Sequence, residues 1–157
     1  MSRGGNDRSG DIGGQGRPLR RFAATPRVEL LTPSGATIEA VVAGRPIARL
    51  LGLAAVDRER APALLIPRCR SVHTAWMRFA LDVVFLRLPE GASGDAPVLS
   101  VHPSVPRRRV VAARGRGSRD EVGRPAALEL APGSAARLGI EPGRALRLRS
   151  GTGAMPA

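Results

Sequence analysis

The stretch from Cys69 to Leu86 reads C-R-S-V-H-T-A-W-M-R-F-A-L-D-V-V-F-L and carries the strongest structural and chemical signals of this chain. It holds the only Cys and the only Trp, together with one of the two His. Its second half continues to Leu88 and is apolar at both alternations of a strand, with several Val. That pattern is typical of a β-strand covered on both faces. The segment therefore predicts a central buried strand at Leu81–Leu88, with a candidate site directly before it.

Short apolar runs separated by turn residues continue on both sides of this segment. The T-P-S-G between two β-compatible runs predicts a hairpin, and Glu141–Arg144 predicts a type II turn. Pro46–Leu53 has apolar residues at helical spacing, and Ser134 is the expected N-cap of one helical turn at Ala135–Leu138. The expected strands are Arg27–Thr32, Ala36–Ala43, Ala63–Pro67, Leu81–Leu88, Val98–His102, Ala126–Ala131 and Ala145–Arg149, and Val110–Val111 is a short apolar run. About eight strands and one or two short helices predict a compact, mainly β fold of the sandwich or half-barrel type.

The length of 157 residues fits one domain with tails. We expect a disordered Gly/Arg-rich tail over 1–24, a single β-rich domain over 25–150 and a C-terminal tail over 151–157. A single Cys cannot form an intrachain disulfide, which is compatible with a reducing compartment. Residues 1–20 lack the apolar core of a signal peptide, and no apolar run reaches the length of a membrane span. We therefore expect a soluble, cytoplasmic protein.

The formal net charge is +12, and all 25 basic residues are Arg. Such a composition is what a G+C-rich genome imposes on surface positions, and we expect weak, nonspecific attraction to polyanions in any case. A dedicated polyanion or nucleic-acid site is an alternative. It requires that Arg107–Arg109 and Arg114–Arg119 form one patch.

Three ordered blocks carry a family resemblance: R-L-L-G-L at 49–53, the central segment, and L-E-L-A-P-G-S-A-A-R-L-G-I-E-P-G at 128–143. Over Val28–Arg149 the chain resembles the domain of unknown function 192 family. The resemblance implies a compact, mostly β domain and no established activity. It also implies an accessory role at the envelope, in secretion or pilus assembly. One departure is Ala80, where the family usually has Pro.

A nucleophilic site is the sharpest chemical hypothesis for the central segment. Cys69 would act as thiolate, His73 as its base and Asp82 as the group that orients the imidazole. In an extended segment, however, Cys69 and His73 lie about 13 Å apart, so a turn between them is required. Because two His and one Cys do not fill a metal shell by their spacing, we expect no metal and no cofactor. A thiol- or His-dependent enzyme remains an alternative reading.

A binding face for an unidentified small molecule or protein is the more economical functional reading. If Val72–Met77 is extended, His73 and Met77 lie on one face and Trp76 on the other. An exposed Trp76 beside an arginine would form a platform for a sugar ring, an anionic molecule or a peptide strand. The predicted binding residues are Arg70, His73, Trp76, Met77, Arg78 and Asp82.

Two structural alternatives stand beside the binding face. Trp76, Met77 and Phe79 are simply core residues in the first. In the second, Asp82 is buried and accepts backbone N–H groups as a structural lock, and this is the role that we favour for it.

Overall fold

The computed structural model describes residues 22, 25–44, 52–54, 56–114 and 123–149. The predicted tails lie outside these residues except for Phe22, which is buried in the protein core. Most of the predicted helix Pro46–Leu53 and positions 115–122 of the long predicted loop also lie outside them. Nine strands and two short helical segments occupy the described chain. They are β1 (Arg27–Leu31), β2 (Thr37–Val42), η2 (Arg58–Arg60), β3 (Ala63–Pro67), β4 (Ser71–His73), β5 (Leu81–Leu88), β6 (Gly94–Val105), β7 (Val110–Ala112), β8 (Arg124–Leu130), α2 (Ser134–Arg137) and β9 (Ala145–Arg149). The prediction of a mainly β fold is confirmed.

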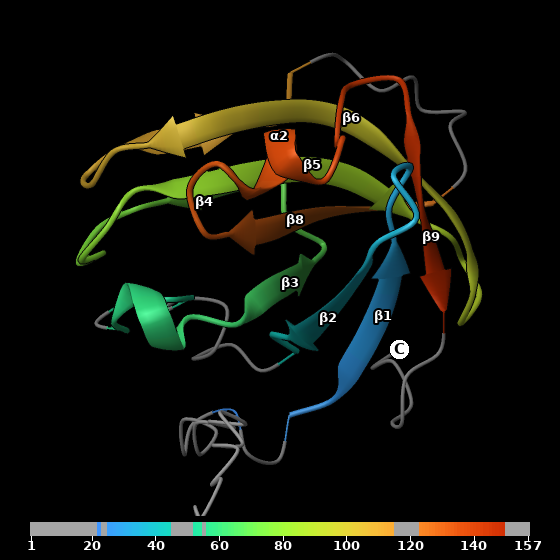
Figure 1. The fold of residues 1–157 in the computed structure, drawn as a ribbon, viewed down its shortest axis with the longest axis horizontal. Helices are drawn as coiled ribbons and strands as arrows, with labels where there is room; N and C mark the ends of the chain where they lie inside the picture. Colours follow the sequence, from blue (N-terminus) through green and yellow to red (C-terminus); the bar gives the residue numbers. More distant parts are fainter. Residues whose placement is uncertain (1–21, 23–24, 45–51, 55, 115–122, 150–157) are drawn as a thin grey trace, which may run out of the picture.

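Seven of the strands form a closed barrel in the order β1-β2-β3-β8-β5-β6-β9 (Figure 1). The predicted hairpin β1–β2 is antiparallel, as is the predicted hairpin β5–β6. Pairing of β9 with β1 closes the barrel between its two terminal strands. The strands β4 and β7 pair only with each other and form a separate two-stranded sheet.

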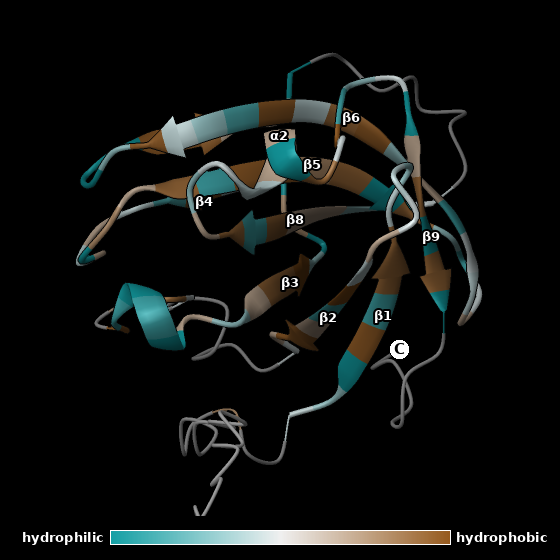
Figure 2. Cartoon of the chain, in the orientation of Figure 1, coloured by the Kyte–Doolittle hydropathy of each residue, from teal (hydrophilic) through white to brown (hydrophobic). Residues whose placement is uncertain are grey.

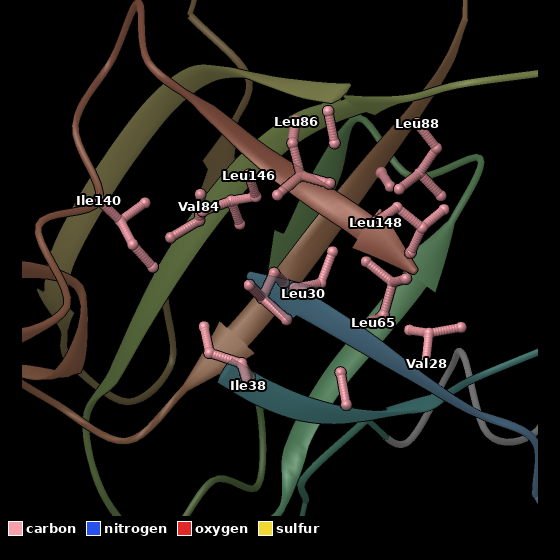
Figure 3. Packing of buried hydrophobic residues seen from close by; sticks show 14 of the residues in the cluster. Val28, Leu30, Ile38, Leu65, Val84, Leu86, Leu88, Ile140, Leu146 and Leu148 are labelled. Atoms are coloured by element: carbon pink, nitrogen blue, oxygen red, sulfur yellow. The ribbon is translucent and has the colours of Figure 1, made fainter. Parts of the chain in front are cut away.

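The barrel interior holds an inner core of aliphatic side chains. Strands β1 and β9 bury every second residue, so their apolar residues face inward and their polar residues face outward, an alternation visible in Figure 2. Figure 3 shows the inner-core side chains converging from strands around the barrel. Its labelled members are Val28, Leu30, Ile38, Leu65, Val84, Leu86, Leu88, Ile140, Leu146 and Leu148.

A second, outer core covers the other face of β3, β5 and β8. Residues of β5 alternate between the two cores: Val84 and Leu86 point inward, whereas Val83 and Phe85 join the outer core. The prediction that Leu81–Leu88 is covered on both faces is therefore confirmed. Other members of the outer core are Phe22, Val41, Ala43, Leu53, Ala54, Val56, Leu64, Ile66, Val72, Met77, Leu81, Val105 and Ala127.

The helical turn α2 begins differently from the prediction. Gly133, in a left-handed conformation with φ of 80°, occupies the N-cap position, and Ser134 is the first helical residue. No side chain of the local sequence caps the helix. Its Ala135 N–H instead donates to the carboxylate of Asp82 on β5. A contact from a distant strand thus replaces the expected local cap.

Candidate functional site

The segment between β4 and β5 turns sharply at Trp76. Strand β4 ends at His73, so the alternation expected over Val72–Met77 stops there. Trp76 has a φ of 59°, a left-handed conformation that is unusual for a bulky residue. Its side chain is 70% exposed, whereas Met77 is buried in the outer core. The core alternative therefore holds for Met77 and not for Trp76.

Trp76 shares the exposed side of the turn with His73. The two rings meet edge to face, with centroids 6.4 Å apart and an interplanar angle of 89°. The left-handed turn brings Trp76 back toward the end of β4, which a continuing strand would not do. His73 and Trp76, which the sequence placed on opposite faces, thus form one surface.

Thr74 joins this turn to the turn between β6 and β7. Its hydroxyl donates to the carbonyl of Pro106 at 2.7 Å and accepts from the backbone N–H of Arg109 at 2.9 Å. Its backbone N–H donates to the Arg109 carbonyl at 2.8 Å, and its carbonyl accepts from the Arg108 N–H at 3.0 Å. Thr74 is fully buried. These four bonds hold together two turns that lie about thirty residues apart in the sequence.

A groove of about 700 Å³ opens between the two turns. Ala75, Trp76 and Met77 line it from the β4–β5 side, and Pro106, Arg107 and Arg108 line it from the β6–β7 side. Both turns project from the same end of the molecule, at the left of Figure 1. Arg108 has a φ of 58°, so a left-handed non-glycine residue lies on each side of the groove. Such strain costs about 1–2 kcal/mol per residue and persists only where the surrounding contacts impose it.

A second hollow of about 370 Å³ adjoins the groove at Pro106, which lines both. It lies between the end of β6 and β7, and its charged lining residues are Arg109 and Arg114. His102 also lines it. Burial lowers the pKa of His102, the nearby charge of Arg114 lowers it further, and a backbone hydrogen bond at Ala112 opposes both. Folding therefore favours the neutral form of this imidazole.

Four arginines lie around Pro106, in the linings of the two hollows. Arg107 and Arg108 line the groove, Arg109 and Arg114 line the second hollow, and no Asp or Glu is among the described residues of either lining. None of the four forms an ion pair within the described chain. By contrast, the predicted binding residue Arg78 is engaged by Asp57 at 2.7 Å. The surface around Pro106 is thus strongly positive.

Asp82 lines neither the groove nor the second hollow, although Ser104, whose N–H it binds, lies between two residues that line the second hollow. It is fully buried, with one oxygen accepting from the Ser104 N–H at 2.8 Å and the other from the Ala135 N–H at 2.9 Å. Ser104 is left-handed, and the β5–β6 pairing is irregular between Leu81 and Val83. This irregularity is a bulge in β6. Asp82 therefore holds the bulge and the helical turn α2 against β5, which is the geometry expected of a structural lock.

The three residues of the thiol hypothesis are arranged differently from a triad. The Cys69 sulfur donates to the Ser71 carbonyl at 3.0 Å, and the side chain is partly buried against the outer core. Within the described residues no hydrogen bond joins Asp82 to His73, since both Asp82 oxygens meet backbone N–H groups. No described set of three or more His, Cys, Asp or Glu is arranged to hold a metal ion.

The structure therefore gathers only part of the predicted binding set. His73, Trp76 and Met77 lie at the groove or beside it, Arg70 is exposed near β4, and Asp82 is sealed elsewhere. Sequence reasoning missed Pro106, Arg107 and Arg108 as partners of Trp76. The run of three arginines at 107–109 is plain in the sequence. No residue pattern predicts its contact with a Trp about thirty residues upstream.

Glu129 on β8 is a second buried acid outside the groove. It is 2% exposed, and its neighbours across the sheet are Leu64 on β3 and Val83 on β5. One carboxylate oxygen has no hydrogen-bond partner. Burial raises the pKa of Glu129 to about 7, and a backbone hydrogen bond at Leu53 opposes the shift. A Cβ at Gly52, which has a φ of 47°, would lie 3.1 Å from the unpartnered oxygen, so a larger residue there would press on the Glu129 carboxyl.

Replacing Thr74 by Val is expected to lower the free energy of unfolding by about 1–3 kcal/mol, because it leaves buried polar groups of both turns without partners. Chemical denaturation followed by circular dichroism measures this loss. Thr37→Val, at the exposed start of β2, is the matched control and should change stability by less than about 0.5 kcal/mol. Equal stability of the two variants would contradict the bridging role of Thr74.

Comparisons with known proteins agree with this fold. The model of the DUF192 family, described as "Uncharacterized ACR", matches residues 29–148. A proposed transcription regulator from Sinorhizobium meliloti 1021 is similar with a TM-score of 0.54 and 26% identity, over 80% of this chain and 93% of that one. A protein of unknown function from Novosphingobium aromaticivorans DSM 12444 has a TM-score of 0.56 and 18% identity, over 85% of this chain and 99% of that one, and supports the fold alone.

No curated protein matches the chain significantly. Among the described helices, none has the length and apolar character needed to cross a bilayer. The family match covers most of the chain, including the central segment and the strands that close the barrel around it. This chain belongs to the domain of unknown function 192 family.

Proposed function

We propose that this protein is a non-enzymatic binding module that takes its ligand or partner in the groove beside Trp76. The observation that carries the proposal is the Trp76 side chain, 70% exposed on a left-handed backbone and facing two arginines across the groove. An exposed aromatic side chain does not contribute the stabilising free energy that burial of an apolar side chain provides, as it does for the neighbouring Met77. Strain and exposure at one residue, imposed by surrounding hydrogen bonds, are typical of binding positions.

The chemistry of the groove favours a ligand with a flat apolar part and a negative charge. The indole face of Trp76 offers a stacking surface, and Pro106 extends it. Arg107 and Arg108 supply planar guanidinium groups that suit carboxylate, sulfonate or phosphate. A volume of about 700 Å³ is within the range of small-molecule sites.

The probe 8-anilinonaphthalene-1-sulfonate tests the proposal, because it combines a flat ring with an anionic group. Trp76 is the only Trp, so energy transfer from its emission to the probe reports binding at the groove. We expect Trp76→Ala to weaken probe affinity by about 5- to 150-fold, which corresponds to the 1–3 kcal/mol of a stacking contact. Probe fluorescence itself gives the affinity of the variant that lacks Trp.

The double variant Arg107→Gln/Arg108→Gln should also weaken probe binding. Arg147→Gln/Arg149→Gln is the matched control, since it removes the same charge from β9. Arg147 lies opposite Asp95 on β6, roughly 30 Å along the strand from Val105. The proposal fails if Trp76→Ala, folded by circular dichroism, binds the probe as tightly as the natural chain.

A further inference from the structure

We infer that the groove binds single-stranded nucleic acid, with one base stacked on Trp76 and the flanking phosphates held by the arginines around Pro106. The inference rests on the proposed function of the groove and names its ligand class. It is carried by three features of the surface: its charge, its aromatic platform and its concave shape.

The charge exceeds what a single small anion requires. Arg107 and Arg108 lie on one side of Pro106, and Arg109 and Arg114 line the adjoining hollow. In the part of the chain that the structure describes, no carboxylate pairs with any of the four. Four arginines in two neighbouring hollows match a ligand with several regularly spaced negative charges. A polynucleotide backbone has such charges, one for each nucleotide.

The aromatic platform selects among polyanions. Trp76 has a free ring face, and bases stack on such faces with little dependence on sequence. A duplex keeps its bases stacked on one another, so it offers none to Trp76. An acidic peptide or an inorganic polyanion would satisfy the arginines and leave the indole without a planar partner. Among these polyanions, single-stranded nucleic acid satisfies both parts of the surface.

The shape argues against a membrane surface as the occupant. A residue that anchors a protein to a bilayer inserts into a broad, flat interface. Trp76 instead forms one wall of a hollow with Ala75 and Met77, and Pro106, Arg107 and Arg108 lie across from it. A narrow chain can enter this hollow and continue past Pro106 into the second one.

The test is a titration of the intact chain with a ten-nucleotide oligothymidylate, followed by quenching of Trp76 emission and by anisotropy of a labelled oligonucleotide. We expect quenching on binding, and a fall of log K against log salt with a slope of about −3, since four phosphate contacts on a single strand contribute about −0.7 each. Arg107→Gln/Arg108→Gln and Arg109→Gln/Arg114→Gln should each reduce this slope by about 1.4. The control Arg147→Gln/Arg149→Gln should change the slope by less than the value for one phosphate contact, about 0.7.

The aromatic contribution is measured separately. Trp76→Ala should weaken oligothymidylate binding by about 5- to 150-fold with the slope unchanged, and Trp76→Phe should restore part of the affinity. If Trp76 had only a structural role, Trp76→Phe would not restore binding affinity while the salt dependence of binding stays unchanged.

Four outcomes would overturn the inference. In the first, thymidine monophosphate binds as tightly as the decamer, and in the second, a duplex of the same sequence binds more tightly than the single strand. In the third, long-chain inorganic polyphosphate binds as tightly as the decamer, and Trp76→Ala does not weaken its binding. In the fourth, the protein binds phosphatidylglycerol vesicles and does not bind the decamer. If the decamer fails while the anilinonaphthalene sulfonate still requires Trp76, only the nucleic-acid inference falls. If Trp76→Ala affects neither probe, the proposed function falls as well.

Discussion

Replacing Asp82 by Ala is expected to lower the free energy of unfolding by about 2–6 kcal/mol. The substitution removes the acceptor of two backbone N–H groups, those of Ser104 and Ala135, in a fully buried place. Each buried donor left without a partner costs about 1–3 kcal/mol. Domains of this size are stable by only about 5–15 kcal/mol, so this loss is a large fraction of the total stability. The bulge in β6 and the helical turn α2 should loosen together, because one carboxylate holds both.

Urea denaturation followed by far-ultraviolet circular dichroism measures the loss. Trp76 emission is a poor probe here, since its ring is already exposed in the folded state. Asp82→Asn retains one carbonyl acceptor and should lie between the Ala variant and the natural chain. Asp95→Ala breaks an exposed pair with Arg147 and should cost no more than about 1 kcal/mol. A loss at Asp82 as small as that at Asp95 would rule out the lock.

The contribution of Glu129 to the stability of the protein is expected to fall as pH rises from about 4.5 to about 7. The carboxyl has its ordinary pKa of 4.5 when unfolded and about 7 when folded. Below pH 4.5 both states hold the proton. Between these values the folded state keeps a proton that the unfolded state releases, so raising the pH favours unfolding. Above pH 7 both are ionised, and the folded state carries a buried charge with one oxygen unpartnered.

Glu129→Gln isolates this contribution, because Gln resembles the protonated carboxyl in shape and stays neutral. The variant should match the natural chain near pH 4 and be more stable at pH 8 by up to about 3 kcal/mol. His102 acts in the opposite direction: its pKa is lowered by folding, so its contribution to stability is lost as pH falls below its ordinary value of 6.5. His102 is present in both proteins, so its contribution cancels when the free energies of unfolding of the two proteins are subtracted at each pH. If the difference in free energy of unfolding between the two proteins does not change with pH, the pKa of Glu129 is not raised by folding.

The strand pattern of this fold was largely predictable from local sequence. β3 and β9 begin and end at the predicted residues, and β5 was recognised because both of its alternations are apolar. A strand buried on both faces requires a layer of protein on each side, and the inner and outer cores are these layers. The lock role of Asp82 was also accessible, because an acid at the start of such a strand must find hydrogen-bond partners.

The candidate site was less predictable, because its geometry departs from local rules. The alternation of β4 ends at His73, and no residue type announces the left-handed backbone at Trp76, where Gly or Asn would be expected. The meeting of Trp76 with Arg107 and Arg108 depends on hydrogen bonds of Thr74 to backbone atoms of the distant turn. Backbone acceptors and donors have no signature in a sequence.

By itself, the sequence determined the class of fold, most of its strands and the segment in which the chemistry lies, because hydrophobic alternation and turn residues act over a few positions. Only the tertiary structure decided that the barrel closes through β9 and β1, that Asp82 is sealed beneath α2, and that Trp76 faces arginines across a groove. These features depend on contacts between segments remote in the chain. Their free energy comes from buried hydrogen bonds and packing that no local pattern encodes.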